Sequence, residues 1–201
     1  TIEAVIKGVG ATSNGHVDSL FASNRTAQVR AIRQAMVNYA AREDNALPWV
    51  YDYIECHGTG TQVGDRTEIE ALEDVLSTQK PTEPVPIGSL KALIGHTKSA
   101  AGVSSVLKCV LMMKHRKIPP STYWESSDLV HQHVHVSATV IDFSSRTSPL
   151  RMGVSAFGFG GANYHVLLED SSGVSNLIPV DRGFQDQKSV LLLAEVHSPL
   201  S

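Results

Sequence analysis

Residues 54–72 read IECHGTGTQVGDRTEIEAL and connect an apolar strand to a helix through a loop in which glycine and threonine alternate. The apolar run before His57 predicts that a strand ends at this histidine. The apolar residues that recur after Asp65 fall on one side of a helix, which we expect to begin at that aspartate. A histidine at the end of a strand, held by such a loop, is a candidate for chemistry.

Strands and helices alternate on both sides of this stretch, and a hairpin follows them. We expect strands at residues 1–10, 50–55, near 87 and at 134–143, with a polar turn at 11–17 after the first strand, helices at 25–42, from 65 and at 99–115, and hairpin arms at 151–156 and 164–169. This order indicates an α/β layered half-domain. The polar residues 171–189 suggest a linker, and residues 190–196 read as the start of another strand.

The ends and faces of two expected helices can be read from their residues. Ser23 and Asn24 are candidate caps for the helix of residues 25–42. The helix of residues 99–115 is rich in apolar side chains, and a double proline at 119–120 ends this part of the chain. We expect the following side chains of that helix to face the interior: Val103, Val106, Leu107, Val110 and Leu111.

Composition and charge place the chain among ordinary globular domains. It has 201 residues, of which 42% are hydrophobic and 18% charged, and its net charge is −3. This balance gives no excess of positive charge with which the chain would bind nucleic acid or an anionic membrane. No apolar run approaches the roughly 18 residues that span a bilayer, and the first residues lack the features of a signal peptide, so we expect a cytoplasmic protein. Cys56 and Cys109 have neither metal nor disulfide spacing, and we expect reduced thiols.

Two further segments share the character of the histidine loop. Residues 88–102 read GSLKALIGHTKSAAG, and residues 153–165 read GVSAFGFGGANYH. Together with HGTGT, they resemble the second half of a β-ketoacyl synthase, over roughly residues 5–169. The resemblance implies an α/β fold that is the C-terminal half of a thiolase-like layered αβαβα arrangement at residues 1–170. A linker and the start of a following region would then occupy residues 171–201.

The resemblance implies a set of catalytic groups. His57 of the HGTGT loop and His96 of the GH pair would converge on a cysteine nucleophile. Lys91 would act electrostatically beside His96, the alternative being an ordinary surface lysine. Decarboxylation of a malonyl thioester puts enolate charge on its carbonyl oxygen, which two oriented imidazole N–H groups would stabilise. We expect a neutral His96, because it precedes the positive end of a helix dipole.

The resemblance also implies residues that contact the substrate. The hydroxyls of Thr59 and Thr61 would hold a pantetheine arm. Phe159 would gate the acyl pocket, and its amide, next to Gly160 in the glycine turn, would form half of the oxyanion hole. A phosphate-binding loop is the alternative for HGTGT, but the motif lacks the Lys-Ser/Thr pair of nucleotide-binding loops.

Two polar residues would support the site without touching the substrate, according to the resemblance. These are Glu68 in the helix after the histidine loop and Asn163 at the end of the glycine turn. The spacing of Asp65 and Glu68 also fits a helix capping box, and this interpretation is the more favoured of the two for Glu68.

The remaining histidines carry no comparable motif. His131, His133 and His135 alternate along one expected strand and could share a face that binds metal, but we favour a solvated edge and expect no metal site. The others are expected to be structural: His16, His115, His165 and His197.

The acyl-accepting cysteine of the family lies in a TACSS-like sequence, and nothing in this chain matches it. Cys56 and Cys109 read as buried packing thiols. We therefore expect part of an acyltransferase, a β-ketoacyl synthase that performs decarboxylative Claisen condensation of acyl and malonyl thioesters in polyketide or fatty acid biosynthesis. The isolated chain should be inactive. The alternative is a non-catalytic scaffold or docking module derived from a ketosynthase, whereas a thiolase is disfavoured because its CxGGG-type turn is replaced here by GFGGAN.

The resemblance further implies the partners of the chain. These are an N-terminal half that carries the cysteine nucleophile, an acyl carrier protein that presents phosphopantetheine-linked substrates, and a second copy in a homodimer of the complete domain. We expect no bound cofactor, no nucleic acid and no membrane.

Overall fold

The computed structural model describes residues 2–16, 22–43, 47–121 and 131–173. The strand expected at 190–196, His197 and most of the expected linker lie outside these residues. Within the described part, no helix is long and apolar enough to cross a membrane.

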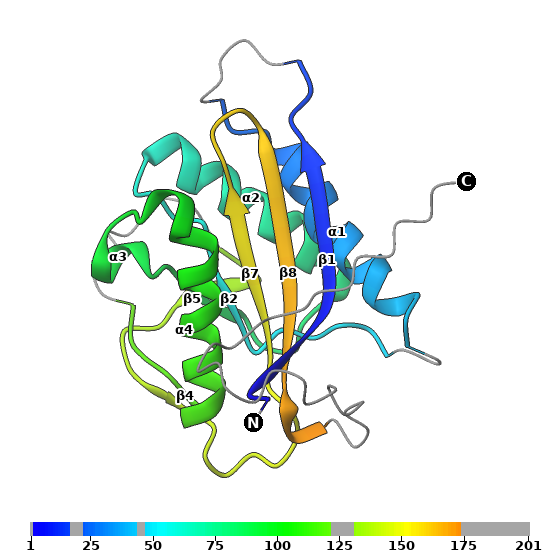
Figure 1. Ribbon diagram of the computed structural model, residues 1–201, viewed down its shortest axis with the longest axis vertical. Helices are drawn as coiled ribbons and strands as arrows, with labels where there is room; N and C mark the ends of the chain where they lie inside the picture. Colours follow the sequence, from blue (N-terminus) through cyan, green and yellow to red (C-terminus); the bar gives the residue numbers. More distant parts are fainter. Residues whose placement is uncertain (1, 17–21, 44–46, 122–130, 174–201) are drawn as a thin grey trace, which may run out of the picture.

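Six strands form one mixed sheet in the order β1-β8-β7-β2-β3-β5 (Figure 1). Strands β1, β8 and β7 are antiparallel neighbours, whereas β7, β2, β3 and β5 run parallel to one another. Their bounds are Ala4–Ser13 for β1, Tyr53–Glu55 for β2, Val85–Gly88 for β3, Val134–Val136 for β5, Arg151–Phe157 for β7 and Ala162–Asp170 for β8. Strands β4 (Lys117–Ile118) and β6 (Ile141–Asp142) pair separately.

Helices cover both faces of the sheet, which gives three layers (Figure 1). Helices α1 (Arg25–Ala40) and α2 (Gln62–Gln79) lie together on one face, and α4 (Ala101–His115) lies on the other. The four-residue helix α3 (Lys91–Ile94) and a 3₁₀ turn (Lys98–Ala100) precede α4. A second 3₁₀ turn (Ser171–Gly173) follows β8. The α/β organisation inferred from the alternating elements is confirmed.

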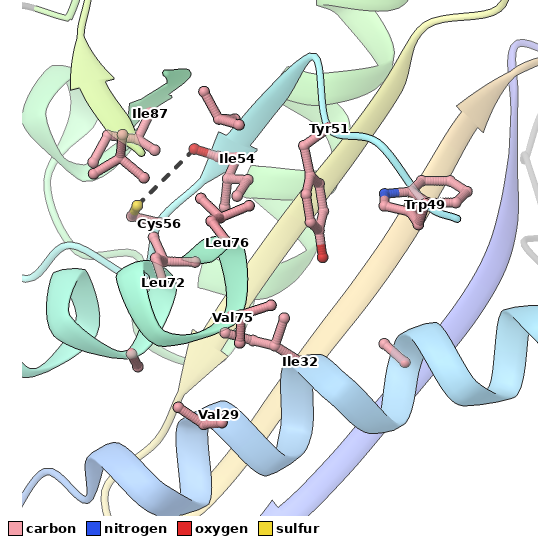
Figure 2. Close-up of a cluster of buried hydrophobic side chains, with 14 of the residues drawn as sticks. Val29, Ile32, Trp49, Tyr51, Ile54, Cys56, Leu72, Val75, Leu76 and Ile87 are labelled. Carbon is pink, nitrogen blue, oxygen red and sulfur yellow. Dashed lines mark hydrogen bonds between the residues drawn. The ribbon is translucent and has the colours of Figure 1, made fainter. Parts of the chain in front are cut away.

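The strand alternation divides the interior into two cores. Tyr53 of β2 points to the α4 side, and its neighbour Ile54 points to the side of α1 and α2. Figure 2 shows Ile54 beside Leu72 and Leu76 of α2, and Ile32 of α1 belongs to the same apolar cluster. The helical face expected to be apolar in α2 is buried, since Ile69, Leu72 and Leu76 are at most 4% exposed.

Helix α1 lies unusually close to β1 because both elements carry small residues where they meet. A Cβ atom on Gly10 would lie 1.9 Å from the carbonyl oxygen of Ala31, and one on Gly8 would lie 2.3 Å from that of Ala35. The side chain of Asn24 accepts a hydrogen bond from the backbone N–H of Ala27, so Asn24 is the cap of this helix, as its residue type predicted.

Several element boundaries differ from expectation. Strand β1 continues through residues 11–13, which were expected to turn, because they pair with the start of β8. Helix α2 begins at Gln62 and not at Asp65. The segment expected to be extended over residues 134–143 is divided between β5 and β6, which belong to different sheets.

The expected interior face of α4 is partly wrong. Val103, Leu107 and Leu111 are 74%, 57% and 47% exposed, whereas Cys109 is buried against the sheet. Val106 packs against the buried core as expected. This helix is apolar on more than one side, so its sequence pattern alone does not show which side faces β7 and β8.

A polar side chain of β8, that of His165, lies within the core. His165 is fully buried, with Nδ1 at 3.0 Å from Ser155 Oγ and Nε2 at 3.0 Å from Tyr51 Oη. Burial lowers the pKa of His165 to about 3, because a charged imidazolium loses its hydration there. The imidazole is therefore neutral at pH 7 and serves the core as a hydrogen-bonding group.

We predict that the stability of the fold decreases as pH falls from about 6.5 toward 3. In this range the unfolded chain binds a proton at His165 that the folded chain excludes, so protonation favours unfolding. In His165→Gln this part of the pH dependence should disappear, and the thermal midpoint should change less between pH 7 and pH 4.5. Replacement of an exposed histidine, His115→Gln, should leave the wild-type slope, and equal slopes in the two variants would contradict the assignment.

Candidate active site

The candidate site lies where three parallel strands end. Strand β2 pairs with β3 on one side and with β7 on the other, so their carboxyl ends share one edge of the sheet. His57 follows β2, Ser89 follows β3 and Gly158 follows β7. This edge is the usual ligand-binding position of a parallel sheet.

The structure brings the two motif histidines together. The ring centroids of His57 and His96 are 5.9 Å apart, with an angle of 86° between the ring planes. Phe157, the last residue of β7, lies at the same centroid distance from His57. The Nδ1 atom of His57 is buried and has no hydrogen-bond partner among the described residues. The imidazole of His57 is thus bordered by the end of β7 and by the segment that follows α3.

A backbone hydrogen bond orients His96. Its Nδ1 atom accepts from the N–H of Lys98 at 3.0 Å. The neutral ring therefore carries its proton on Nε2, which remains a donor. Lys98 adopts a left-handed backbone conformation, with φ of 53°, which is uncommon for a residue other than glycine. This local strain accompanies the contact that fixes the imidazole tautomer.

Both imidazoles are neutral near pH 7. Burial, followed by the positive charge of Lys91 and by His96, lowers the pKa of His57 to about 4. Burial and the charges of Lys91 and Lys98 also lower the pKa of His96. The sequence predicted a neutral His96 because of a helix dipole, but the residue precedes a 3₁₀ turn, and α4 begins only at Ala101.

Lys91 is a partly buried residue at the start of α3 and not an ordinary surface lysine. Burial lowers the pKa of its ammonium group, while the carboxylates of Glu68 and Glu55 act in the opposite direction. The same positive charge disfavours the imidazolium form of both histidines. Lys91 therefore contributes, after burial, to the lowered pKa values of both histidines.

Glu68 holds the histidine loop in place. Its carboxylate accepts hydrogen bonds from the backbone N–H groups of His57 at 2.7 Å and Gly58 at 2.9 Å. The side chain is buried, and burial raises its pKa to about 7 despite these two donors. The capping-box interpretation is wrong, because the cap position of α2 is Thr61 and Asp65 instead accepts from the N–H of Gly60.

The loop itself is a sharp turn with exposed hydroxyls. Gly58 and Gly60 have φ values of +43° and +77°, which side-chain-bearing residues rarely adopt. The hydroxyl oxygens of Thr59 and Thr61 lie 3.2 Å apart. Ser89 donates to the carbonyl oxygen of Gly58 at 3.3 Å, so the turn is also attached to the end of β3.

The glycine turn after β7 presents an aromatic side chain to solvent. Phe159 is 69% exposed, and Gly160 has a φ of +85°. Asn163 is buried and donates to Asn14 Oδ1 at 2.7 Å and to the carbonyl oxygen of Gly161 at 3.1 Å. Asn163 thus holds the turn through its side-chain amide. Its partner Asn14 was missed, because a lone asparagine in an expected polar turn has no distinguishing signal.

Neither cysteine has the environment of a nucleophile. Cys56 and Cys109 are both buried, and burial raises the pKa of each thiol well above its ordinary value. A neutral thiol is a poor nucleophile. Within the described residues, the site therefore contains two candidate hydrogen-bond donors but no activated cysteine.

The histidines of the β5 region form other contacts. His133 Nδ1 lies 2.7 Å from the carboxylate of Glu73, a contact between the residue before β5 and helix α2 that the sequence did not indicate. His135 Nδ1 lies 3.0 Å from the carbonyl oxygen of Pro84. Across the described ranges, no three His, Cys, Asp or Glu side chains are grouped so that they could hold a metal ion.

One buried acidic residue was not predicted from the sequence. Glu55, the last residue of β2, is fully buried and accepts hydrogen bonds from Tyr53 Oη at 2.7 Å and Lys108 Nζ at 2.6 Å. Two sequence features could have indicated it: a carboxylate at the end of an apolar strand and a lysine inside an apolar helix. Separated by 53 residues, they could be paired only in the folded chain.

Comparison with known proteins gives consistent matches. Residues 3–125 match the family described as the C-terminal domain of β-ketoacyl synthase. The chain is 38% identical to a phenolphthiocerol/phthiocerol polyketide synthase of Mycobacterium bovis, over 85% of this chain and 9% of that protein. It is 36% identical to the highly reducing polyketide synthase phiA of a fungal species, over 100% of this chain and 8% of that protein.

A solved structure gives a similar result. The ketosynthase from module 6 of the bacillaene synthase of Bacillus subtilis 168 superposes with a TM-score of 0.74 at 30% identity. The match covers 83% of this chain and 30% of that one. The chain therefore spans under a third of the solved protein and under a tenth of the curated relatives named above.

We predict that Glu68→Gln destabilises the chain by about 1–3 kcal/mol, because the amide has one oxygen for two backbone donors and its NH₂ group would oppose one of them. Urea unfolding at pH 8 measures this difference. The matched control is Glu70→Gln in the same helix, which removes a partly exposed partner of Arg25 and Arg66 and should cost under about 1 kcal/mol. Equal losses in the two variants would contradict a supporting role for Glu68.

Proposed function

The chain belongs to the β-ketoacyl synthase family as the C-terminal domain of a polyketide synthase ketosynthase, and on this basis we propose that it supplies the decarboxylation half of a condensing active site. The observation that carries the proposal is the pairing of two neutral imidazoles, His57 at the end of β2 and His96 in the segment that follows α3. The reaction is a decarboxylative Claisen condensation of an acyl thioester with a malonyl thioester. The nucleophilic cysteine belongs to an N-terminal half outside this chain.

The histidines act on the malonyl thioester. Its C–C bond to the carboxylate breaks with release of carbon dioxide, and the electron pair forms an enolate whose charge develops on the thioester oxygen. His96 donates its Nε2–H to that oxygen, and His57 is the second donor. The enolate carbon then attacks the acyl carbonyl on the cysteine, and the cysteine leaves as a thiolate.

Neutral imidazoles suit this task, because a neutral ring can donate a hydrogen bond without transferring a proton to the enolate. Burial keeps both rings neutral, and the charge of Lys91 acts in the same direction and adds a favourable potential for the developing anion. Glu68 fixes the loop that carries His57 through two backbone hydrogen bonds.

The exposed groups around the histidines suit a carrier-bound substrate. The hydroxyls of Thr59 and Thr61 hold the phosphopantetheine arm of an acyl carrier protein, since neither hydroxyl is buried. Phe159 and Gly160 lie on the turn after β7 and border the acyl chain. No separate cofactor takes part in this scheme, and the complete domain forms a homodimer.

An exposed apolar surface on α4 supports the proposal that a second half of the domain covers this chain. Val103, Leu107 and Leu111 project from α4 away from the sheet. Beside them lies a hollow of about 530 Å³ lined by apolar residues that include Leu90, Ile94, Leu107, Leu111, Pro119 and Val140. Such a continuous apolar surface on α4 fits an N-terminal half that covers this face.

We predict that His57→Ala and His96→Ala abolish decarboxylation and condensation when the chain is joined to an N-terminal half that carries the cysteine. Loss of one preorganised donor should lower the rate about a hundredfold or more, while some acyl transfer to the cysteine remains. Release of carbon dioxide from a malonyl thioester and intact mass of the acylated protein measure the two steps separately.

The isolated chain is the negative control of this experiment and should condense nothing, because a ping-pong reaction needs the nucleophile. Near-normal decarboxylation in either histidine variant would overturn the assigned roles. Stable acylation of Cys56 or Cys109 in the isolated chain would place the nucleophile here. If the joined wild-type protein neither acylates nor decarboxylates, a scaffold or docking module becomes the better description.

We further predict that the α4 face is the association surface for the N-terminal half. Leu107→Lys should weaken co-assembly of the two halves about tenfold or more, because it places a charge in an apolar contact. Val37→Lys is the matched control, since Val37 is 65% exposed on α1, on the opposite side of the sheet. Titration calorimetry or co-purification of separately expressed halves gives the comparison, and equal effects of the two substitutions would refute the surface.

A further inference from the structure

Glu55 connects three elements that surround the histidines. It is the last residue of β2, two positions before His57. One carboxylate oxygen accepts from the backbone N–H of Leu90, which directly precedes Lys91 in α3, and lies 3.5 Å from Ser105 Oγ of α4. The other oxygen accepts from Tyr53 Oη and from Lys108 Nζ of α4. One side chain thus contacts the strand, the short helix and the long helix.

The contacts of Glu55 begin where the backbone hydrogen bonds between β2 and β3 end. Strands β2 and β3 pair up to Glu55 and Gly88, and the N–H of Cys56 donates to the carbonyl oxygen of Gly88 at 2.7 Å. The next links between the two segments are side-chain contacts, namely Glu55 with Leu90 and Ser89 with the carbonyl oxygen of Gly58. The relative position of His57 and the segment 90–96 therefore rests on these polar groups.

A buried ion pair is an expensive way to obtain stability alone. Glu55 is fully buried, and the Lys108 side chain is 11% exposed. Both groups lose hydration, and apolar side chains of similar size would often stabilise a fold equally well. The Glu55 carboxylate can, however, accept from several directions at once, whereas an apolar residue cannot hold the N–H of Leu90.

We propose that Glu55, held by Lys108 and Tyr53, is a positioning residue that fixes the segment carrying Lys91 and His96 relative to His57. The proposal rests on the proposed function, because it assigns the geometry of the two donors to the decarboxylation step. A displacement of about 1 Å between catalytic groups can lower a rate a hundredfold. The effect of Glu55 should therefore appear in decarboxylation and not in acylation of the cysteine, which belongs to the other half.

The test uses the complete ketosynthase with both halves present. Glu55→Gln removes the charge and one acceptor, and we expect decarboxylation to fall about tenfold or more while cysteine acylation stays within about twofold of wild type. The matched control is Asp170→Asn, because Asp170 also forms a partly buried ion pair with Arg116 at the far end of α4 and accepts from the N–H of Leu150. This control should lower the thermal midpoint without changing the ratio of the two rates.

A second variant removes the hydrogen bond between Leu90 and Glu55 without altering any charge. Leu90→Pro removes the N–H that donates to Glu55, and Leu90 has a φ of −59°, which proline adopts readily. We expect decarboxylation to fall about tenfold in this variant as well, with the Glu55–Lys108 pair intact. In the double variant Glu55→Gln with Lys108→Met, the charges are again balanced, but the hydrogen bond to the N–H of Leu90 stays weakened. We therefore expect that decarboxylation does not recover in this variant.

The outcomes distinguish a failure of the positioning role from a failure of the proposed function. If wild type releases carbon dioxide and the Glu55 and Leu90 variants lose decarboxylation and acylation in equal proportion, Glu55 is structural only and the proposal is overturned. Recovery of decarboxylation in the double variant would also overturn it, since charge balance would then be the requirement. If wild type fails to decarboxylate, the proposed function fails first, and the positioning role falls with it.

Discussion

The pairing of β2 with β3 on one side and β7 on the other is the constraint on which the site depends. Although β2 is three residues long, its central place makes three parallel strands end at the same edge. The loops that follow these strands carry His57, Ser89 and the glycine turn, so sheet topology and not sequence proximity assembles the site. The antiparallel pair β7 and β8 adds the turn with Phe159 to this edge.

At this edge of the sheet, two buried carboxylates accept hydrogen bonds from backbone N–H groups that lie beyond the strand pairing. Glu68 accepts from the N–H groups of His57 and Gly58, and Glu55 accepts from that of Leu90. Buried anions need compensating charge, which Lys108 provides for Glu55 through a direct contact. Both carboxylates favour the charged form of Lys91, and its charge adds to burial in keeping the imidazoles neutral. Support of the backbone and control of the histidine pKa values are therefore parts of one electrostatic arrangement.

Sequence reasoning succeeded where a local pattern determines the structure. The family resemblance carried by the HGTGT and GH segments implied that His57 and His96 converge, and their rings lie side by side. Alternating elements predicted the α/β class, which the likeness to a solved ketosynthase extends to the thiolase-like fold. It failed where the answer depends on distant partners. The capping-box spacing of Asp65 and Glu68 is a local signal, but Glu68 instead binds a backbone turn that precedes the helix. Likewise, the Glu55–Lys108 pair and the role of Asn14 depend on contacts between remote segments.

The exposed face of α4 shows how folding and chemistry are linked in this chain. The inner side of the helix packs on β7 through Cys109 and Met112, while its outer side leaves Leu107 and Leu111 uncovered. Lys108 lies between these sides and borders the apolar hollow while it holds Glu55. A partner that covers the hollow would remove more water from the ion pair and strengthen its electrostatic attraction, because attraction between charges rises as the local dielectric constant falls. If the proposed N-terminal half covers this hollow, its assembly would therefore tighten the same contact that we propose orients the histidine segment.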